Sequence, residues 1–230
     1  MQEHISTSFD NDLNDLDAMI TKIGGMVQTQ LNLVLNSLEV GNDEVLNTII
    51  ETDKSIDTLE HEIFDKTVEI IALRSPHAED LRKVMIAPRI ASSNERMGDL
   101  VRNIAKRVLS IHGEGHSLPL AEEIKSLGFD VLEAVTNIND AAARNDVAQA
   151  LKIWESDVNI DEAYDELIKS IVQLIDQKNH DAETIRHTMF IAKNIERIGD
   201  HVTTIAELIH FRVEAKMLSD ERPKLGDAQQ

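Results

Sequence analysis

Apolar residues recur three and four positions apart through most of the chain, the spacing of an amphipathic α-helix. Short polar breaks divide this pattern into six segments, and several of the breaks supply an Asp or Asn that can cap the following helix. The predicted helices cover 10–40, 43–74 and 77–111 in the first half, and 119–145, 146–176 and 181–218 in the second. Pro88 falls inside the third segment, where we expect a kink. The pattern therefore predicts an all-α fold.

Two phrases occur twice in the sequence. Glu-Arg-x-Gly-Asp spans 95–99 and again 196–200, and Asp-x-x-Ile-Asp spans 53–57 and again 157–161. Both repeats keep the same order and nearly the same offset, which indicates a tandem duplication. The stretch "HGEGHSLP" at 112–119, with two Gly and a Pro, marks the boundary between the copies. We therefore expect two tandem antiparallel three-helix bundles, at 1–112 and 120–218, with a linker at 113–119 and a flexible tail at 219–230.

Composition narrows the class of protein. Aromatic residues make up 3% of the chain and hydrophobic residues 42%, which fits a helical protein with a packed core. The formal charge of −19 would repel nucleic acid and anionic lipid, so basic protein surfaces and cations are the natural partners. The chain has no cysteine, and no apolar run approaches the ~20 residues of a membrane span. The first residues lack the features of a signal peptide, so we expect a cytoplasmic protein without membrane insertion.

Carboxylates lie within the apolar stripes of four predicted helices. The pairs are Asp53 and Asp57, Glu95 and Asp99, Asp157 and Asp161, and Glu196 and Asp200, with Glu60 on the same stripe as the first pair. Most acidic pairs on helices are simply solvated. A buried ionised carboxylate, however, must be paired, protonated or bound to a metal. Arg102 is the one basic residue near these positions in the first half, and Thr203 occupies the matching position in the second. The four inward pairs therefore predict cation sites with oxygen ligands.

The sequence offers no comparable signal for catalysis. Glu207 and His210 form one Glu-x-x-His pair, whereas di-iron bundles use two that face each other. The remaining histidines show no zinc-like spacing, and the chain contains no nucleophile elbow and no dinucleotide fingerprint. We therefore expect a protein that is not an enzyme.

These motifs together resemble the PhoU family of bacterial phosphate-uptake regulators over nearly the whole chain. The resemblance rests on "NERMGD", "ERIGDHVTTIAE" and "SPHAEDLRKVM", and on the paired Asp-x-x-x-Asp and Glu-x-x-x-Asp positions. The family commonly has Asn four residues after the last Asp of the motif, which maps onto Asn103 in the first repeat, whereas the second has Thr204. Tyr164 stands where the first repeat has Glu60.

The resemblance implies a cytoplasmic, metal-binding negative regulator of phosphate uptake and of phosphate-regulon signalling. It implies contact with the ATPase subunit of the phosphate ABC transporter and with a phosphate sensor histidine kinase, and often a homodimer. The metal could be iron, Mn, Mg, Zn or Ca. The alternative is a metal-dependent enzyme or metal store built on the same bundles. The first repeat offers five inward carboxylates and the second four, so we expect the first to hold metal more fully.

Overall fold

The computed structural model describes residues 2–39, 42–177 and 180–218, and over these ranges its regular structure is helical. Six helices follow one another along the chain: α1 (Gln2–Leu35), α2 (Asp43–Arg74), α3 (Ala78–Gly113), α4 (Ala121–Arg144), α5 (Val147–Gln177) and α6 (Ala182–Glu214). The all-α prediction is confirmed.

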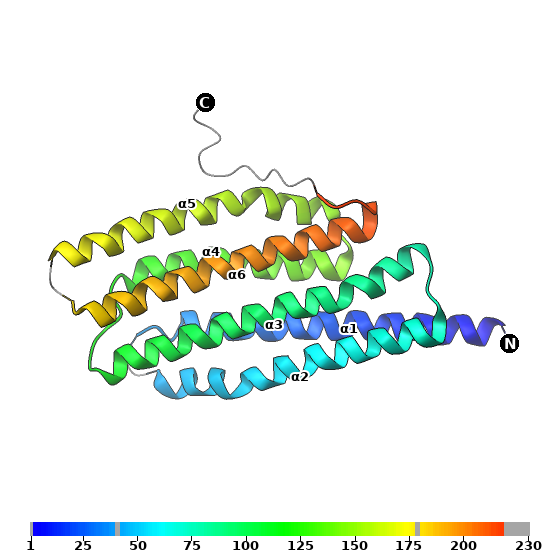
Figure 1. Cartoon of the computed structure of the whole chain (residues 1–230), viewed down its shortest axis with the longest axis horizontal. Coiled ribbons are helices and arrows are strands. Elements are labelled where there is room, and N and C mark those ends of the chain that lie inside the picture. The colour runs from blue at the N-terminus through cyan, green and yellow to red at the C-terminus, as the bar shows by residue number, and fades with distance from the viewer. Residues whose placement is uncertain (1, 40–41, 178–179, 219–230) are drawn as a thin grey trace, which may run out of the picture.

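The helices form two three-helix bundles packed side by side (Figure 1). The first bundle contains α1, α2 and α3, and the second contains α4, α5 and α6. Helices α2, α3, α6 and α5 lie next to one another in that order, and α1 and α4 pack behind them. The bundles meet through α3 against α6 and through α1 against α4. The predicted pair of tandem bundles is therefore confirmed, with an extensive contact between the two copies.

The core is continuous across both bundles. Buried apolar residues of all six helices belong to one cluster. Two glycines allow the close approach of α1 and α4: a Cβ on Gly24 would collide with the side chain of Asn139, and a Cβ on Gly128 would collide with that of Leu35. The two bundles therefore bury apolar side chains against each other in addition to being covalently linked. This favours cooperative unfolding of both bundles as one unit.

Helix α1 begins eight residues and ends five residues before the predicted bounds of 10 and 40, whereas the other helix ends differ by four residues or fewer, and caps explain part of the difference. Leu120 adopts a left-handed conformation, so α4 begins after it rather than at 119. The side chain of Asp181 accepts a hydrogen bond from the Thr184 N–H at 2.9 Å and caps α6. The Thr184 hydroxyl and N–H together lower the pKa of Asp181 to about 2. Helix α3 continues through Pro88.

The connection between the two bundles runs from Glu114 to Leu120, with 113–117 exposed and Leu118 buried. The bundle limits at 1–112 and 120–218 stay a prediction, and the tail at 219–230 lies outside the described residues.

Candidate metal sites in two carboxylate clusters

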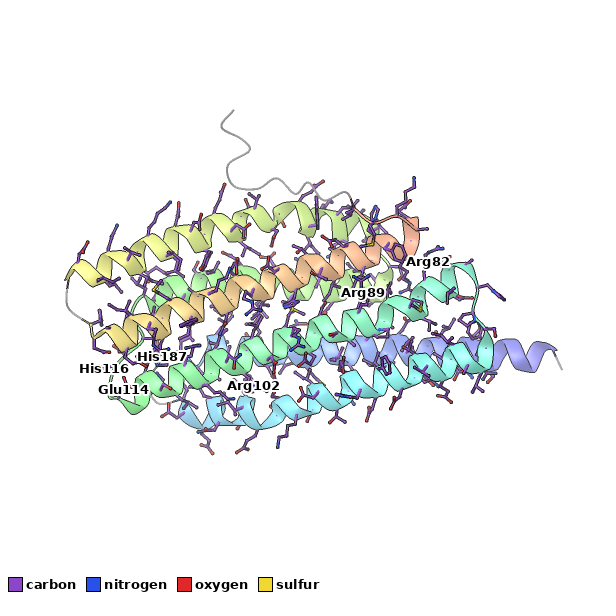
Figure 2. All side chains as sticks on the ribbon, viewed as in Figure 1. Arg82, Arg89, Arg102, Glu114, His116 and His187 are labelled. Carbon is purple, nitrogen blue, oxygen red and sulfur yellow. The ribbon has the colours of Figure 1, made fainter. Side chains whose placement is uncertain are left out.

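The first cluster lies between α2 and α3 and contains Asp53, Asp57, Glu60, Glu95 and Asp99. Asp53 is 2% exposed, and the Arg102 guanidinium of α3 forms an ion pair with it. The same guanidinium lies 2.7 Å from Oδ1 of Asp99. Arg102 lies on the side of α3 that faces α2 (Figure 2). One arginine thus joins a buried carboxylate of α2 to a half-buried carboxylate of α3.

The first cluster remains rich in negative charge despite Arg102. Burial raises the pKa of Asp53 above its ordinary value, and the attraction of Arg102 only partly opposes this. Burial also raises the pKa of Glu95, and the nearby charges of Asp99, Asp57 and Glu60 raise it further. Asp57 and Asp99 therefore act on Asp53, and Asp57, Glu60 and Asp99 act on Glu95, which links the five carboxylates electrostatically.

The glycine of each Glu-Arg-x-Gly-Asp motif faces the buried aspartate of the neighbouring helix. A Cβ on Gly98 would lie 3.7 Å from Oδ1 of Asp53 and 3.0 Å from Cδ1 of Ile56. A Cβ on Gly199 would lie 3.5 Å from Oδ1 of Asp157. A Cβ would fit at Gly199 and would press only on the end of the Ile56 side chain at Gly98, so the repeated Gly marks where the motif helix lies against the aspartate helix in both bundles.

The second cluster lies between α5 and α6 and contains Asp157, Asp161, Glu196 and Asp200. Asp157 is 5% exposed and Asp161 is half-buried. Burial raises the pKa of Glu196, and the charges of Asp200 and Asp161 add to the shift. Asp200 is exposed, although its helical position placed it among apolar residues.

That expectation for Asp200 was wrong for a physical reason. The stripe that carries Asp200 is covered unevenly, since Ala192 is buried and Glu196 half-buried, whereas Met189 is 36% exposed. Helical spacing defines a stripe but does not say whether a neighbouring helix covers it.

A basic partner in the second cluster was missed in the sequence. Nζ of Lys193 lies 2.6 Å from the carboxylate of Glu196, and 5.2 Å from the centre of the Tyr164 ring. The i, i+3 spacing of Lys193 and Glu196 could have revealed this pair. Burial raises the pKa of the Tyr164 phenol, which makes it a weaker anionic ligand than the Glu60 it replaces.

The donor set of both clusters suits a hard cation, because it consists of carboxylate oxygens. The amide of Asn103, half-buried one turn beyond Asp99, adds a neutral oxygen in the first bundle. Among the described residues, no three His, Cys, Asp or Glu side chains converge in a ready ligand arrangement. Three carboxylates of the first cluster, those of Asp53, Glu95 and Asp99, are instead paired with Arg102 or Arg96. A cation would have to displace Arg102 from Asp53 or Asp99 to use both.

The two residues of the Glu-x-x-His pair, Glu207 and His210, contact different groups. Glu207 accepts a hydrogen bond from the Trp154 indole N–H at 3.2 Å, and Nδ1 of His210 lies 2.9 Å from the Lys216 carbonyl oxygen.

Replacing Glu95 by Gln is expected to stabilise the metal-free protein slightly at pH 7. The pKa of Glu95 is raised in the folded state, so its ionised form destabilises that state at neutral pH. The gain should shrink as the pH falls through the folded pKa and vanish below the ordinary value of 4.5, where the wild-type carboxyl is protonated in both states. Thermal unfolding in EDTA at pH 7 and near pH 4 would measure this. A variant that is less stable than wild type at pH 7 would contradict it.

Comparison with known protein families agrees with the two-bundle architecture. The PhoU domain matches residues 20–108 and again 124–209, once in each bundle. The phosphate-specific transport system accessory protein PhoU homolog of Caulobacter vibrioides is 33% identical over 98% of both chains. That of Zymomonas mobilis is 38% identical over 94% of this chain and 91% of its own.

Solved structures show the same architecture. PhoU from Pseudomonas aeruginosa superposes with a TM-score of 0.86 at 28% identity, covering 90% of this chain and 100% of that one. The phosphate transport system regulatory protein PhoU from Streptococcus pneumoniae superposes with a TM-score of 0.84 at 25% identity, covering 92% and 99%. Two three-helix bundles in tandem thus place the chain with bacterial phosphate-transport accessory and regulatory proteins. The chain belongs to the PhoU family.

Within the described residues, no helix is both long and apolar enough to cross a membrane.

Proposed function

We propose that the chain is a negative regulator of phosphate uptake and of phosphate-regulon signalling. It acts in the cytoplasm as an adaptor between the ATPase subunit of the phosphate ABC transporter and its sensor histidine kinase. The match of the PhoU domain to both bundles carries this proposal, together with relatives named as accessory proteins of a phosphate-specific transport system. Because those relatives are named as accessory proteins, we propose a binding role and not a catalytic one. A homodimer is the proposed assembly.

We also propose that both clusters bind divalent or trivalent metal ions. The proposed ligands are Asp53, Asp57, Glu60, Glu95, Asp99 and Asn103 in the first bundle, and Asp157, Asp161, Glu196 and Asp200 in the second. The carboxylate pairs and the facing glycines recur at matching positions in the two bundles, which supports a shared role. A bound cation would stabilise the ionised carboxylates and change the charge of the outer surface of α2, α3, α5 and α6.

The adaptor role is tested by direct binding. The purified protein should bind the ATPase subunit and the cytoplasmic part of the sensor kinase from the same organism. The affinity should fall steeply as salt is added, since an acidic protein would meet basic surfaces and the Debye length shrinks to about 3 Å at 1 M salt. Isothermal titration calorimetry at two salt concentrations would measure this. Failure to bind either protein would contradict the adaptor role.

A further inference from the structure

Large apolar side chains are exposed on the helices that flank the α2–α3 turn. On α2 these are Phe64, Val68 and Ile71, which are 55%, 51% and 37% exposed. On α3 they are Leu81 and Met85, which are 39% and 53% exposed. All five lie within about 15 Å of the turn along the helix axes, at 1.5 Å per residue. We call these five residues the hairpin patch.

The hairpin patch occupies the same helical stripe as the first carboxylate cluster. At 3.6 residues per turn, Phe64 and Val68 continue the stripe of Asp57 and Glu60 on α2. Met85 lies about 40° from Asp99 around α3, toward the same side of that helix. The α2–α3 hairpin therefore presents one outer face, which is apolar near the turn and acidic further along.

The second bundle repeats part of this surface. Val172 and Ile175 of α5 are 47% and 52% exposed, and they stand at the same offset from Val68 and Ile71 as the repeated aspartate motifs do from each other. The same residue types are thus exposed at matching positions in both bundles. Neither bundle buries these apolar side chains. Contact with a partner would explain why these exposed positions are apolar.

The charges around the hairpin patch indicate the chemistry of the partner. The carboxylates of Asp57 and Glu60 lie at one end of the patch, and Asp65 and Glu69 are exposed on α2 beside it. Lys66, Arg74 and Lys83 are engaged by acidic groups of this chain, Arg82 donates to the Arg212 carbonyl oxygen, and Arg89 is exposed on α3. Nζ of Lys66 lies 2.8 Å from Asp12 Oδ1 and 3.4 Å from Glu69 Oε2, and the Arg74 guanidinium lies 2.8 Å from Asp12 Oδ2. The exposed charge on the α2 side of the patch is therefore negative, whereas Arg89 flanks the α3 side.

This charge disfavours two otherwise plausible occupants. Anionic lipid would be repelled by the carboxylates. Two copies that met through this patch would bring the exposed carboxylates of one α2 against those of the other. A partner segment that is apolar on one side and basic on the other would match both the apolar part and the acidic part of this surface.

We propose that the hairpin patch docks an amphipathic, basic helix of a partner protein. Its apolar residues, spaced three and four positions apart, would pack on Phe64, Val68 and Met85, and its Lys or Arg residues would lie against the carboxylates further along the hairpin. The inference deepens the proposed function and rests on it for the partner's identity alone. The docking chemistry follows from the surface itself.

A labelled model helix tests the surface independently of any natural partner. The probe is a peptide of about 18 residues with leucine on one face and lysine on the other, long enough to be helical when bound. Fluorescence anisotropy in EDTA should detect binding to the wild-type protein, and at least about tenfold weaker binding to a Val68→Ser, Met85→Ser double variant. The matched control replaces Leu33 of α1 and Phe129 of α4, each 38% exposed, by Ser and should bind like wild type.

Three results would overturn the inference: no binding of the peptide to wild type, equal binding by both double variants, or equal binding of a scrambled peptide of the same composition. A wild-type dimer that dissociates on Val68→Ser, Met85→Ser substitution, seen by analytical ultracentrifugation, would also overturn it by showing that a second copy covers the patch. Circular dichroism confirms that each variant is folded.

The same variants separate this inference from the adaptor role. Binding of the purified ATPase subunit or sensor kinase that is lost in the Val68→Ser, Met85→Ser variant and kept in the control supports both. If these proteins bind all three forms equally, the docking surface is wrong and the adaptor role stands. If neither binds wild type while the peptide binds and discriminates the variants, the adaptor role is wrong and the docking surface stands.

Discussion

Replacing Arg102 by Met should lower the free energy of unfolding of the metal-free protein by about 3 kcal/mol, the lower end of the range for breaking a buried ion pair. Asp53 is 2% exposed, and Arg102 is the cation that pairs with it. Without this arginine the ionised carboxylate would stay buried with no opposite charge beside it. Urea unfolding in EDTA at pH 7 would measure the change.

Arg96 provides the matched control for Arg102. Its guanidinium lies 3.4 Å from Glu95 and 3.7 Å from Asp99, but its side chain is 61% exposed, so Arg96→Met should change stability by less than about 1 kcal/mol. The loss in Arg102→Met should also shrink in acid. Burial raises the pKa of Asp53, so its ionisation penalty is present above the folded pKa and disappears as the pH falls toward 3.8. Equal effects of the two substitutions at pH 7 would contradict this account of Asp53.

Removing carboxylates from the first cluster should cost more bound metal than removing them from the second. We expect an Asp57→Ala, Asp99→Ala variant to lose most of the metal, and an Asp161→Ala, Asp200→Ala variant to lose less. The first cluster has five carboxylates, and more anionic oxygen binds a hard cation more tightly. In the second cluster Lys193 competes for Glu196, and Asp200 is exposed.

The measurement is elemental analysis of protein purified without chelators and without an affinity tag. Arg102 works against the expected difference, since it competes with a cation for Asp53 and Asp99. Equal losses would mean that the extra carboxylate of the first cluster is not a ligand. No loss in either variant would mean that the clusters hold no metal.

The sequence predicted the parts of the fold that depend on local periodicity and on the repeat. Asp53 and Asp157 were placed inward from helical spacing alone, and they are 2% and 5% exposed. Spacing fixes which side chains share a face of one helix, and this was sufficient for both aspartates.

Features that depend on packing between helices could not be predicted from the sequence. The apolar stripe of α2 that contains the buried Asp53 becomes exposed at Phe64. No described helix covers the outer side of the α2–α3 hairpin near the turn. The close packing of α1 on α4 depends on Gly24 and Gly128, whose role is visible only once the facing side chains are placed. Lys193 was overlooked because the first bundle has its cation at Arg102, a position that the second bundle fills with Thr203.

Deleting the gene in its native organism tests the central claim most directly. A reporter for the phosphate regulon should be read in phosphate-replete medium, with and without a plasmid that restores the wild-type chain. A negative regulator of phosphate signalling predicts high reporter activity in the deletion strain despite ample phosphate, and return to low activity on complementation. Reporter activity that stays low and responds normally to phosphate in the deletion strain would contradict it.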